Sequence, residues 1–185
     1  MLSINKINIK KELIGILLSL IKNYHFDIME FSYVKNNSFS IDEISLIKSF
    51  LNKIINAEYE IHIMSKYLIL NNYYKKISIV HLENKMYNFD KIAISPSFCW
   101  NYINYYKFSK ILIMSVIPGF GNQKFLLNTL NKIKNKKNID GGINYYIYNK
   151  IKNYFNKIII GSNIVSFKNK LNYYKTNFIL NEYKI

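Results

Sequence analysis

The sequence repeats one pattern along its length, in which short apolar runs rich in β-branched residues alternate with longer segments of helical periodicity. Most of these runs carry no polar face, which is typical of parallel strands covered on both sides. Strands that alternate with helices build a parallel sheet, so the pattern predicts an α/β fold. The predicted strands are Leu2–Ile7, Tyr24–Met29, Tyr59–Met64, Ile77–Leu82, Lys91–Ser95, Ile111–Val116, Asn138–Asp140 and Lys157–Gly161.

Segments between these runs have the spacing of amphipathic helices, and three of them are long enough to predict a helix with some detail. They are Lys10–Lys22, Ile41–Asn56 and Gln123–Lys136. Their apolar residues recur every three or four positions and so share one helical face. Ser40 stands three residues before Glu43, which predicts a capping box at the start of the second helix.

Eight strands alternating with helices predict a (β/α)8 TIM barrel, and the alternative is a doubly wound open sheet. A chain of 185 residues is short for a full barrel, so its helices must be trimmed. The connection Glu83–Asp90, for example, leaves room for barely two helical turns. No linker or low-complexity block divides the chain, which predicts a single barrel domain over residues 1–185.

The formal net charge of +15 would ordinarily suggest a nucleic-acid partner. Every basic residue is Lys, however, and Arg, which reads bases and phosphates with two parallel hydrogen bonds, is absent from the sequence. The abundant Lys, Asn, Ile, Tyr and Phe are the residues that an AT-rich genome encodes most often. We therefore expect no nucleic-acid partner, and we expect the charge to attract anionic substrates.

Several other classes of protein are excluded by composition. A hydrophobic content of 50% and an aromatic content of 16% exclude a disordered chain. Cys99 is the single cysteine and cannot form an internal disulfide. The longest apolar run, Leu13–Ile21, is too short to cross a bilayer, and no cleavage site follows it. We expect a cytoplasmic protein with no membrane partner.

Rare polar residues gather at the ends of the predicted strands. His25 and Asp27 are two residues apart on one strand and therefore point to the same face. His62 lies near the end of the next strand, and Asp140 ends the seventh. The C-terminal strand ends of a (β/α)8 barrel form its active-site face. Two His and two carboxylates converging there predict a divalent-metal site.

Other strand-end residues allow two interpretations. His81 is the weakest metal candidate, because Glu83 follows two residues later and the pair can serve simply to shape the site. Met29, Met64 and Met114 also end strands. Filling the core is the favoured interpretation for these methionines, and an apolar collar around the reacting centre is the alternative.

Glycine is scarce in this chain, and most of its glycines fall in three short segments that each follow a strand. The segments are Gly119–Gly121, Gly141–Gly142 and Gly161–Ser162. Backbone N–H groups in glycine-lined loops can hold a phosphate without a cationic side chain. The loops after the last two strands are also where (β/α)8 barrels typically bind phosphate. The pattern therefore favours an enzyme that acts on a phosphosugar.

Two longer segments of the sequence are MSVIPGFGNQKF (114–125) and IDGGIN (139–144). They resemble the two signature segments of the ribulose-phosphate 3-epimerase family. The resemblance covers nearly the whole chain, and the family has a (β/α)8 barrel of the ribulose-phosphate-binding type. The other matching segments, in the family's order, are HFDIME (25–30), EIHIM (60–64), VHLE (80–83) and IIIGSNI (158–164).

The resemblance implies an isomerase that interconverts D-ribulose 5-phosphate and D-xylulose 5-phosphate in the pentose phosphate pathway. His25, Asp27, His62 and Asp140 match the ligands of one divalent metal ion, which could be Fe2+, Zn2+, Mn2+ or Co2+. Asp27 matches the proton acceptor and Asp140 the donor on the opposite face. One carboxyl removes the C3 proton, the metal stabilises the enediolate oxygens, and the other carboxyl returns a proton.

The resemblance also assigns substrate contacts and implies that the chain forms homo-oligomers. Ser3 matches a substrate-contacting serine near the first strand, although its spacing to His25 is short. The matching substrate-binding positions are Ser3, His62, Gly119, Phe120, Gly121, Asn122, Gly141, Gly142, Gly161 and Ser162.

Three positions depart from the family's pattern. The usual Gly-Phe-Gly-Gly loop ends here in Asn122, and the usual Met-Asp-Gly continues here as Glu30 and Phe31. If the loop needs a positive φ at residue 122, Asn is the least costly replacement for Gly. Two alternative functions remain: a 3-epimerase of a hexulose 6-phosphate such as allulose 6-phosphate, and a decayed barrel that acts as a basic binding protein.

Overall fold

A computed structural model describes residues 2–4, 23–54, 56–66, 70, 72–84, 89–98, 107–132 and 137–161. The predicted helix Lys10–Lys22 lies outside these residues, as do Cys99 and Ser162. Ser3 is described by its backbone alone. None of the helices in the described part of the chain is both long and apolar enough to cross a membrane.

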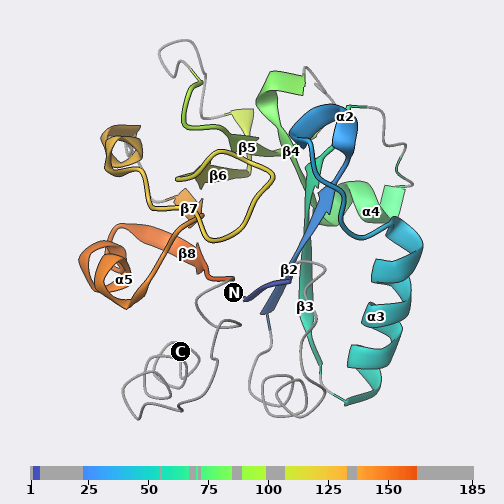
Figure 1. The fold of residues 1–185 in the computed structure, drawn as a ribbon. Coiled ribbons are helices and arrows are strands. Elements are labelled where there is room, and N and C mark those ends of the chain that lie inside the picture. The colour runs from blue at the N-terminus through green and yellow to red at the C-terminus, as the bar shows by residue number, and fades with distance from the viewer. Residues whose placement is uncertain are drawn as a thin grey trace.

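Eight parallel strands form one sheet in which each strand pairs with the next along the chain (Figure 1). The pairing register brings His25 opposite Glu60 and Asp27 opposite His62. Each predicted strand is present, with bounds that differ by a few residues. The strands are β1 Leu2–Ile4, β2 Asn23–Met29, β3 Glu58–Met64, β4 Ser78–His81, β5 Lys91–Ile94, β6 Lys110–Met114, β7 Lys137–Asp140 and β8 Phe155–Ile159.

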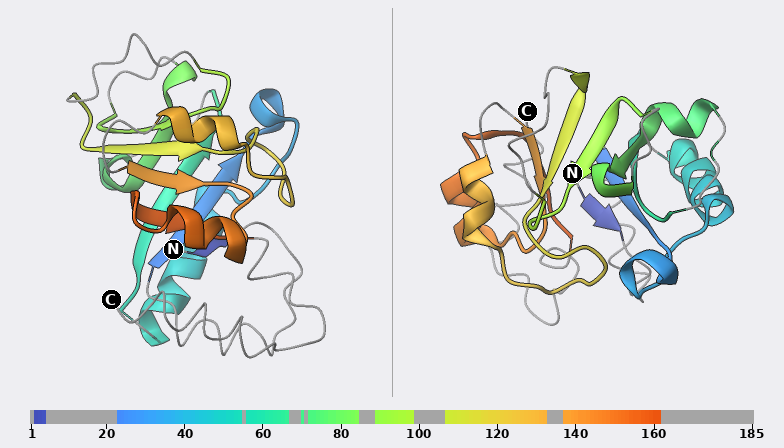
Figure 2. Two further views of the ribbon diagram at one scale, coloured as in Figure 1. Left: turned by 90° about the vertical axis from the view of Figure 1, so that its left-hand side faces the viewer. Right: turned by 90° about the horizontal axis from the view of Figure 1, so that it is seen from above.

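The sheet curls into a trimmed (β/α)8 barrel with helices on its outside (Figure 2). Within the described residues the ladder runs from β1 to β8, and it includes no pairing between β8 and β1. Within the described segments the helices are short except for α3, and α5 lies outside β8, on the opposite side of the molecule from α3 (Figure 1). The helices are α2 Phe31–Val34, α3 Ile41–Ile54, α4 Asn72–Ile77 and α5 Tyr145–Ile151, with 3-10 helices at Leu82–Asn84 and Leu127–Lys132.

The two faces of the curled sheet are packed differently. One face carries the large apolar cluster that includes Phe26, Ile61 and Ile113 and packs against the helices. Side chains alternate along a strand, so the neighbours of these residues point to the inside of the barrel. There a small aliphatic cluster, which includes Leu112 and Ile159, fills the side formed by β4, β5, β6 and β8. Among the described residues, the rest of the interior is largely polar, where β2, β3 and β7 contribute side chains together with His81 of β4 and Lys110 of β6.

The helix predicted over Ile41–Asn56 is confirmed, together with its capping box. The Glu43 N–H donates to Ser40 Oγ at 3.2 Å, and the Ser40 N–H donates to Glu43 Oε2 at 2.8 Å. These two reciprocal bonds satisfy backbone donors that the first turn of a helix leaves unpaired. Ile44 is buried on the inner side of α3.

The helix predicted over Gln123–Lys136 is wrong for residues 123–126, and residues 133–136 lie outside the described part of the chain. Residues 123–126 are irregular, and a 3-10 helix follows at Leu127–Lys132. The side chain of Gln123 donates to the carbonyls of Ile117 and Phe120, and the Leu126 N–H donates to the Ser115 carbonyl at 2.8 Å. These tertiary bonds hold the chain in a loop over β6 and override the helical periodicity.

Candidate metal and catalytic site

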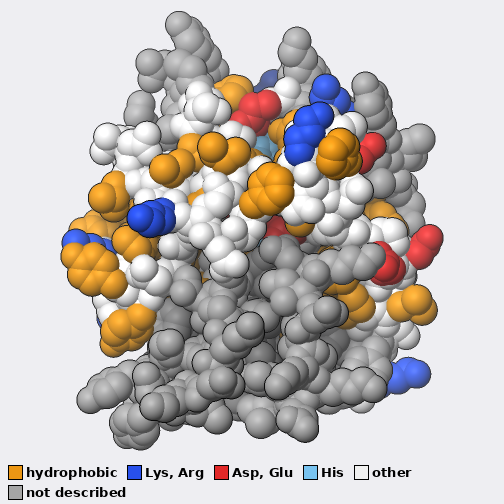
Figure 3. All heavy atoms as spheres, in the orientation of Figure 1, with side chains coloured by type: hydrophobic (Ala, Val, Ile, Leu, Met, Phe, Trp, Pro, Cys, Tyr) orange, Lys and Arg blue, Asp and Glu red, His pale blue; other side chains and the backbone are white. Residues whose placement is uncertain are grey.

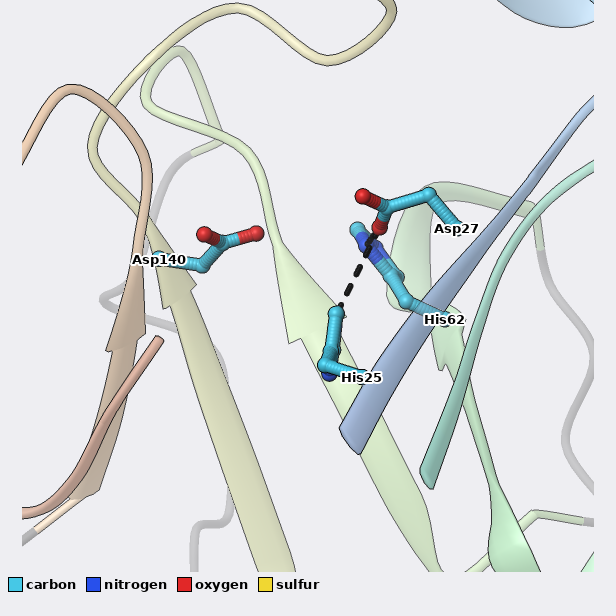
Figure 4. A group of neighbouring side chains, drawn as sticks. All are labelled: His25, Asp27, His62 and Asp140. Carbon is cyan, nitrogen blue, oxygen red and sulfur yellow. Dashed lines mark hydrogen bonds and ion pairs between the residues drawn. The ribbon is translucent and has the colours of Figure 1, made fainter. Parts of the chain in front are cut away.

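Four side chains from three strands meet inside the barrel at the C-terminal end of the sheet. His25 and Asp27 come from β2, His62 from β3 and Asp140 from the last position of β7. One potential ligand atom from each residue lies within 4.8 Å of the others. Figure 4 shows Asp140 pointing across the site toward Asp27 and His62. The positions of these residues at predicted strand ends predict this convergence, and the structure brings the four residues together.

Asp27 is the centre of this group. Its Oδ1 lies 3.1 Å from Nδ1 of His62 and 3.4 Å from Nε2 of His25. Burial alone would raise the pKa of Asp27, but the contacts with the two imidazoles lower it below its ordinary range. Asp27 is therefore an ionised carboxylate at neutral pH.

Asp140 has the opposite electrostatic environment. Burial, together with the charge of Asp27 across the site, raises the pKa of Asp140 to about 7. Ser115 fixes the end of β7, because its N–H donates to the Asp140 carbonyl at 2.7 Å. The site thus pairs a carboxylate that is ionised with one that can hold a proton near neutral pH, which is how proteins assign a base and an acid to two like groups.

His25 is completely buried and presents one ring nitrogen to the site. Its Nδ1 lies 2.8 Å from Oε1 of Glu60, and its Nε2 has no hydrogen-bond partner. A carboxylate can only accept, so Nδ1 carries a proton, and when the ring holds a single proton its lone pair is on Nε2. A buried nitrogen with a free lone pair is the donor that a metal ion requires. Glu60 is not among the site residues predicted from the sequence, although it lies two residues before His62 and hence on the same face.

His81 contacts His62 on the side of the ring that faces away from Asp27. The Nε2 atoms of the two rings are 2.9 Å apart, and Nδ1 of His81 lies 3.2 Å from Ser95 Oγ and 3.4 Å from Glu83 Oε2. Burial lowers the pKa of both imidazoles, so both rings are neutral. His81 lies outside the group of four, in agreement with the interpretation that His81 and Glu83 shape the site.

The carboxylate of Glu83 fixes the tautomers of this chain of rings. Burial raises its pKa, but the contacts with His81 and Ser95 outweigh burial and lower the pKa to about 2, so Glu83 is ionised. It favours a proton on Nδ1 of His81, whose Nε2 then accepts from Nε2 of His62. Nδ1 of His62 lies 3.1 Å from Asp27 Oδ1, so both atoms are placed to bind one cation beside them. The donor set of two imidazoles and two carboxylates therefore fits a divalent metal ion.

The ribulose-phosphate 3 epimerase family matches residues 1–165, which is most of the chain. The chain belongs to the ribulose-phosphate 3-epimerase family. A ribulose-phosphate 3-epimerase of Buchnera aphidicola subsp. Acyrthosiphon pisum (strain APS) is 31% identical over 135 residues, which cover 62% of this chain and 58% of that protein. The ribulose-phosphate 3-epimerase of Buchnera aphidicola subsp. Baizongia pistaciae (strain Bp) is 30% identical over 205 aligned positions, which cover 93% of this chain and 88% of that protein. The match thus spans less than two thirds of the first relative.

A pocket opens beside the two aspartates and is lined by the loops that the family resemblance singles out. Its walls include Gly119–Asn122, Gly141–Gly142 and Gly161. The described residues that line it include no Lys, although the chain carries a net charge of +15. Backbone groups, rather than ammonium groups, are therefore what these loops offer to an anion.

The backbone of these loops requires residues that tolerate a positive φ. Gly141 has a φ of +108°, and a Cβ there would come within 2.5 Å of Val116. Asn122, which replaces a glycine of the family pattern, has a φ of +59°. The sequence-based explanation of this departure is confirmed, because the loop does require a left-handed residue at this position and Asn adopts that conformation at low cost.

The three strand-end methionines also line this pocket, while their side chains are almost completely buried. Met29 is 9% exposed, and Met64 and Met114 are each 3% exposed. They fill space as core residues do and also form an apolar wall next to Asp27 and Asp140. Their position is therefore compatible with both interpretations, core filling and an apolar collar beside the two aspartates.

The segment after β2 carries the other departures from the family pattern and is tied firmly to the site. Ser38 Oγ donates to the Asp27 carbonyl and accepts from the Met29 N–H at 2.8 Å. Glu30 Oε2 accepts from Ser65 Oγ at 2.5 Å, which joins the ends of β2 and β3. Phe31 is 57% exposed. Exposed apolar side chains are visible over the upper half of the molecule in Figure 3. The departures leave the four central residues in place.

Proposed function

We propose that this protein is a metal-dependent ribulose-phosphate 3-epimerase that interconverts D-ribulose 5-phosphate and D-xylulose 5-phosphate. The observation that carries the proposal is the pair of facing aspartates whose surroundings separate their proton affinities: Asp27 is held ionised, whereas the pKa of Asp140 is raised to about 7. Family membership supplies the substrate class. Inversion at a carbon next to a carbonyl needs a base on one side and an acid on the other.

His25, Asp27, His62 and Asp140 would hold one divalent ion such as Fe2+, Zn2+, Mn2+ or Co2+. His25 would contribute Nε2 and His62 would contribute Nδ1, the nitrogens that their partners leave available. The bound ion supplies positive charge that stabilises the oxygens of the enediolate.

In the proposed reaction, Asp27 removes the proton from C3 and Asp140 delivers a proton to the opposite face. The ionised state of Asp27 suits a base, and the raised pKa of Asp140 suits a proton donor near neutral pH. The reverse reaction exchanges the two roles. The buried methionines around the aspartates exclude water from the reacting carbon.

The glycine loops would bind the rest of the substrate. We assign the phosphate to backbone N–H groups of Gly141, Gly142 and Gly161 together with Ser162, and the sugar chain to Gly119, Phe120, Gly121 and Asn122. Ser3 and His62 complete the proposed contacts. We also propose that the protein acts in the pentose phosphate pathway and has no nucleic-acid partner.

Incubation of the zinc- or iron-loaded protein with D-ribulose 5-phosphate in deuterated water tests the proposal. We expect xylulose 5-phosphate that carries deuterium at C3, and a fall of about 10²–10⁴-fold in its formation for Asp140→Asn. Asp42→Asn, on the exposed side of α3, is the matched control and should retain activity. Turnover of allulose 6-phosphate alone would assign a hexulose phosphate, and the absence of metal binding and turnover would indicate a binding protein.

A further inference from the structure

We propose that Glu60 is a positioning residue, paired with Lys110, that fixes the tautomer and ring orientation of His25. The inference rests on the proposed metal-dependent function, since His25 would be one of the metal ligands. Glu60 lies on β3 directly opposite His25 on β2. It is buried, with 5% of its surface exposed, and it is not one of the four residues that converge on the site.

The two carboxylate oxygens of Glu60 have different partners. Oε1 contacts Nδ1 of His25 at 2.8 Å, and Oε2 pairs with the ammonium of Lys110. Lys110 begins β6, so this ion pair crosses the interior of the barrel from β3. Its side chain is 19% exposed, so the pair is largely shielded from solvent. Lys110 therefore gives the buried carboxylate of Glu60 a cationic partner, without which a buried charge would be costly.

The charged form of Glu60 determines which nitrogen of His25 faces the site. A carboxylate has no proton to donate, so only the ring form with a proton on Nδ1 satisfies the contact. That form leaves the lone pair on Nε2, the buried atom without a hydrogen-bond partner that lies 3.4 Å from Asp27 Oδ1. Lys110 and Glu60 thus orient His25, the proposed metal ligand, through its Nδ1, on the side of the ring that faces away from the site.

The variant Glu60→Gln gives an unusual prediction because the amide has one acceptor and one donor end. The Lys110 ammonium will attract the amide oxygen, which turns the NH2 group toward His25. Nδ1 must then accept, and the ring proton moves to Nε2. We expect the tautomer of His25 to reverse and zinc affinity to fall about 10–100-fold.

The double variant Glu60→Gln with Lys110→Met separates positioning from a merely structural role. Without the ammonium the amide can rotate and present its oxygen to Nδ1 again. We therefore expect the wild-type tautomer and most of the zinc affinity to return, although two groups of the ion pair are now missing. Glu58→Gln on the same strand is the matched control, because Glu58 is exposed and its contact with Lys157 is a long 3.8 Å.

Two measurements test the inference. Nitrogen-15 NMR of the metal-free protein reports each tautomer directly, and the chain has only 3 His to assign. Zinc affinity is measured by competition with a chelator, and thermal unfolding verifies that the variants fold.

A proton on Nε2 of His25 in the wild-type protein would overturn the inference even if no variant folds. So would a Glu60→Gln variant that keeps the tautomer and the zinc affinity of the Glu58→Gln control. Wild-type protein that binds no zinc but has the expected tautomer would contradict the proposed function while leaving the positioning role of Glu60 intact.

Discussion

Chemically identical side chains acquire different properties in this site through their neighbours. Asp27 has two imidazoles beside it and stays ionised, whereas Asp140 faces Asp27 across a buried space and holds its proton to a pKa of about 7. The imidazoles are similarly distinguished, because His25 is oriented by Glu60 while His62 is oriented by His81. The proton affinities of the two aspartates are therefore set by burial and by members of the site, whereas the orientations of the two imidazoles are set by residues one step removed from it.

Glu83 illustrates how such a supporting residue affects the pH dependence of stability. Its folded-state pKa of about 2 is below the ordinary value of 4.5, so its stabilising contribution is present above pH 4.5 and is lost as the pH falls toward 2. We expect Glu83→Gln to be about 2 kcal/mol less stable than the wild type at pH 7 in urea unfolding of metal-free protein. This difference should shrink between pH 4.5 and 3. A difference that is constant with pH would contradict the assignment.

Asn122 tests the backbone requirement of the loop after β6. With its φ of +59°, Asn122→Gly should change the free energy of unfolding by less than about 0.5 kcal/mol, whereas Asn122→Ala should lower it by about 1 kcal/mol. Urea unfolding measures both. Because the loop lines the pocket, Asn122→Ala should also raise the KM for the phosphosugar. Equal stability of the Ala and Gly variants would show that the conformation of residue 122 is not constrained.

The central residues of the site could be predicted from the sequence because they are rare residues at the ends of recognisable strands. Supporting residues could not be found in the same way. Glu60 follows the alternation of its strand, but nothing in the sequence pairs it with Lys110, which comes from another strand. Ser38 is an ordinary polar residue in a loop, and only the fold brings its hydroxyl to the Asp27 carbonyl. Contacts between distant segments depend on register and curvature that local patterns do not contain.

At the scale of elements, strands were more predictable than helices. A parallel strand is recognised by a continuous apolar run, and burial on both faces enforces that composition. The segment Gln123–Lys136 has helical spacing, yet the bonds from Gln123 to the carbonyls of the preceding loop hold its first residues in an irregular conformation. Periodicity predicts a helix only where no tertiary hydrogen bonds compete for the backbone.

The capping box of α3 gives a quantitative prediction for an element. Ser40→Ala removes the acceptor of the Glu43 N–H and should lower the free energy of unfolding by about 1 kcal/mol in urea. Glu43→Ala breaks the reciprocal bond and should cost a similar or smaller amount. The double variant should lose less than the sum of the two, because the bonds support one another. Strict additivity would indicate that the two bonds act independently.

At the scale of the whole molecule, the net charge and the site are separate features. The chain has a formal net charge of +15, but the described lining of the pocket includes no Lys. The positive charge therefore attracts an anionic substrate from a distance and does not contact it in the pocket. Salt weakens this attraction, because at about 0.1–0.15 M it screens charges that are more than about 8–10 Å apart. We expect kcat/KM for a phosphosugar to fall severalfold between about 0.02 and 0.2 M salt, while kcat stays constant. A salt effect on kcat alone would contradict this separation.

The metal position also joins strands that have no ladder between them. His25 and Asp27 belong to β2 and His62 to β3, whereas Asp140 belongs to β7, and the described sheet ladder connects β3 to β7 only through the strands between them. An ion bound by all four residues would close the barrel across its interior, and it would bind the folded state alone.

At a zinc concentration of about 100 times Kd, zinc binding should add about 2.7 kcal/mol to the free energy of unfolding, or a rise of about 5–10 °C in Tm for a chain of this size. Thermal unfolding with zinc and with chelator measures the shift. Asp140→Asn, which removes the ligand from the far side, should retain only a small part of it, and an undiminished shift in that variant would place the metal elsewhere.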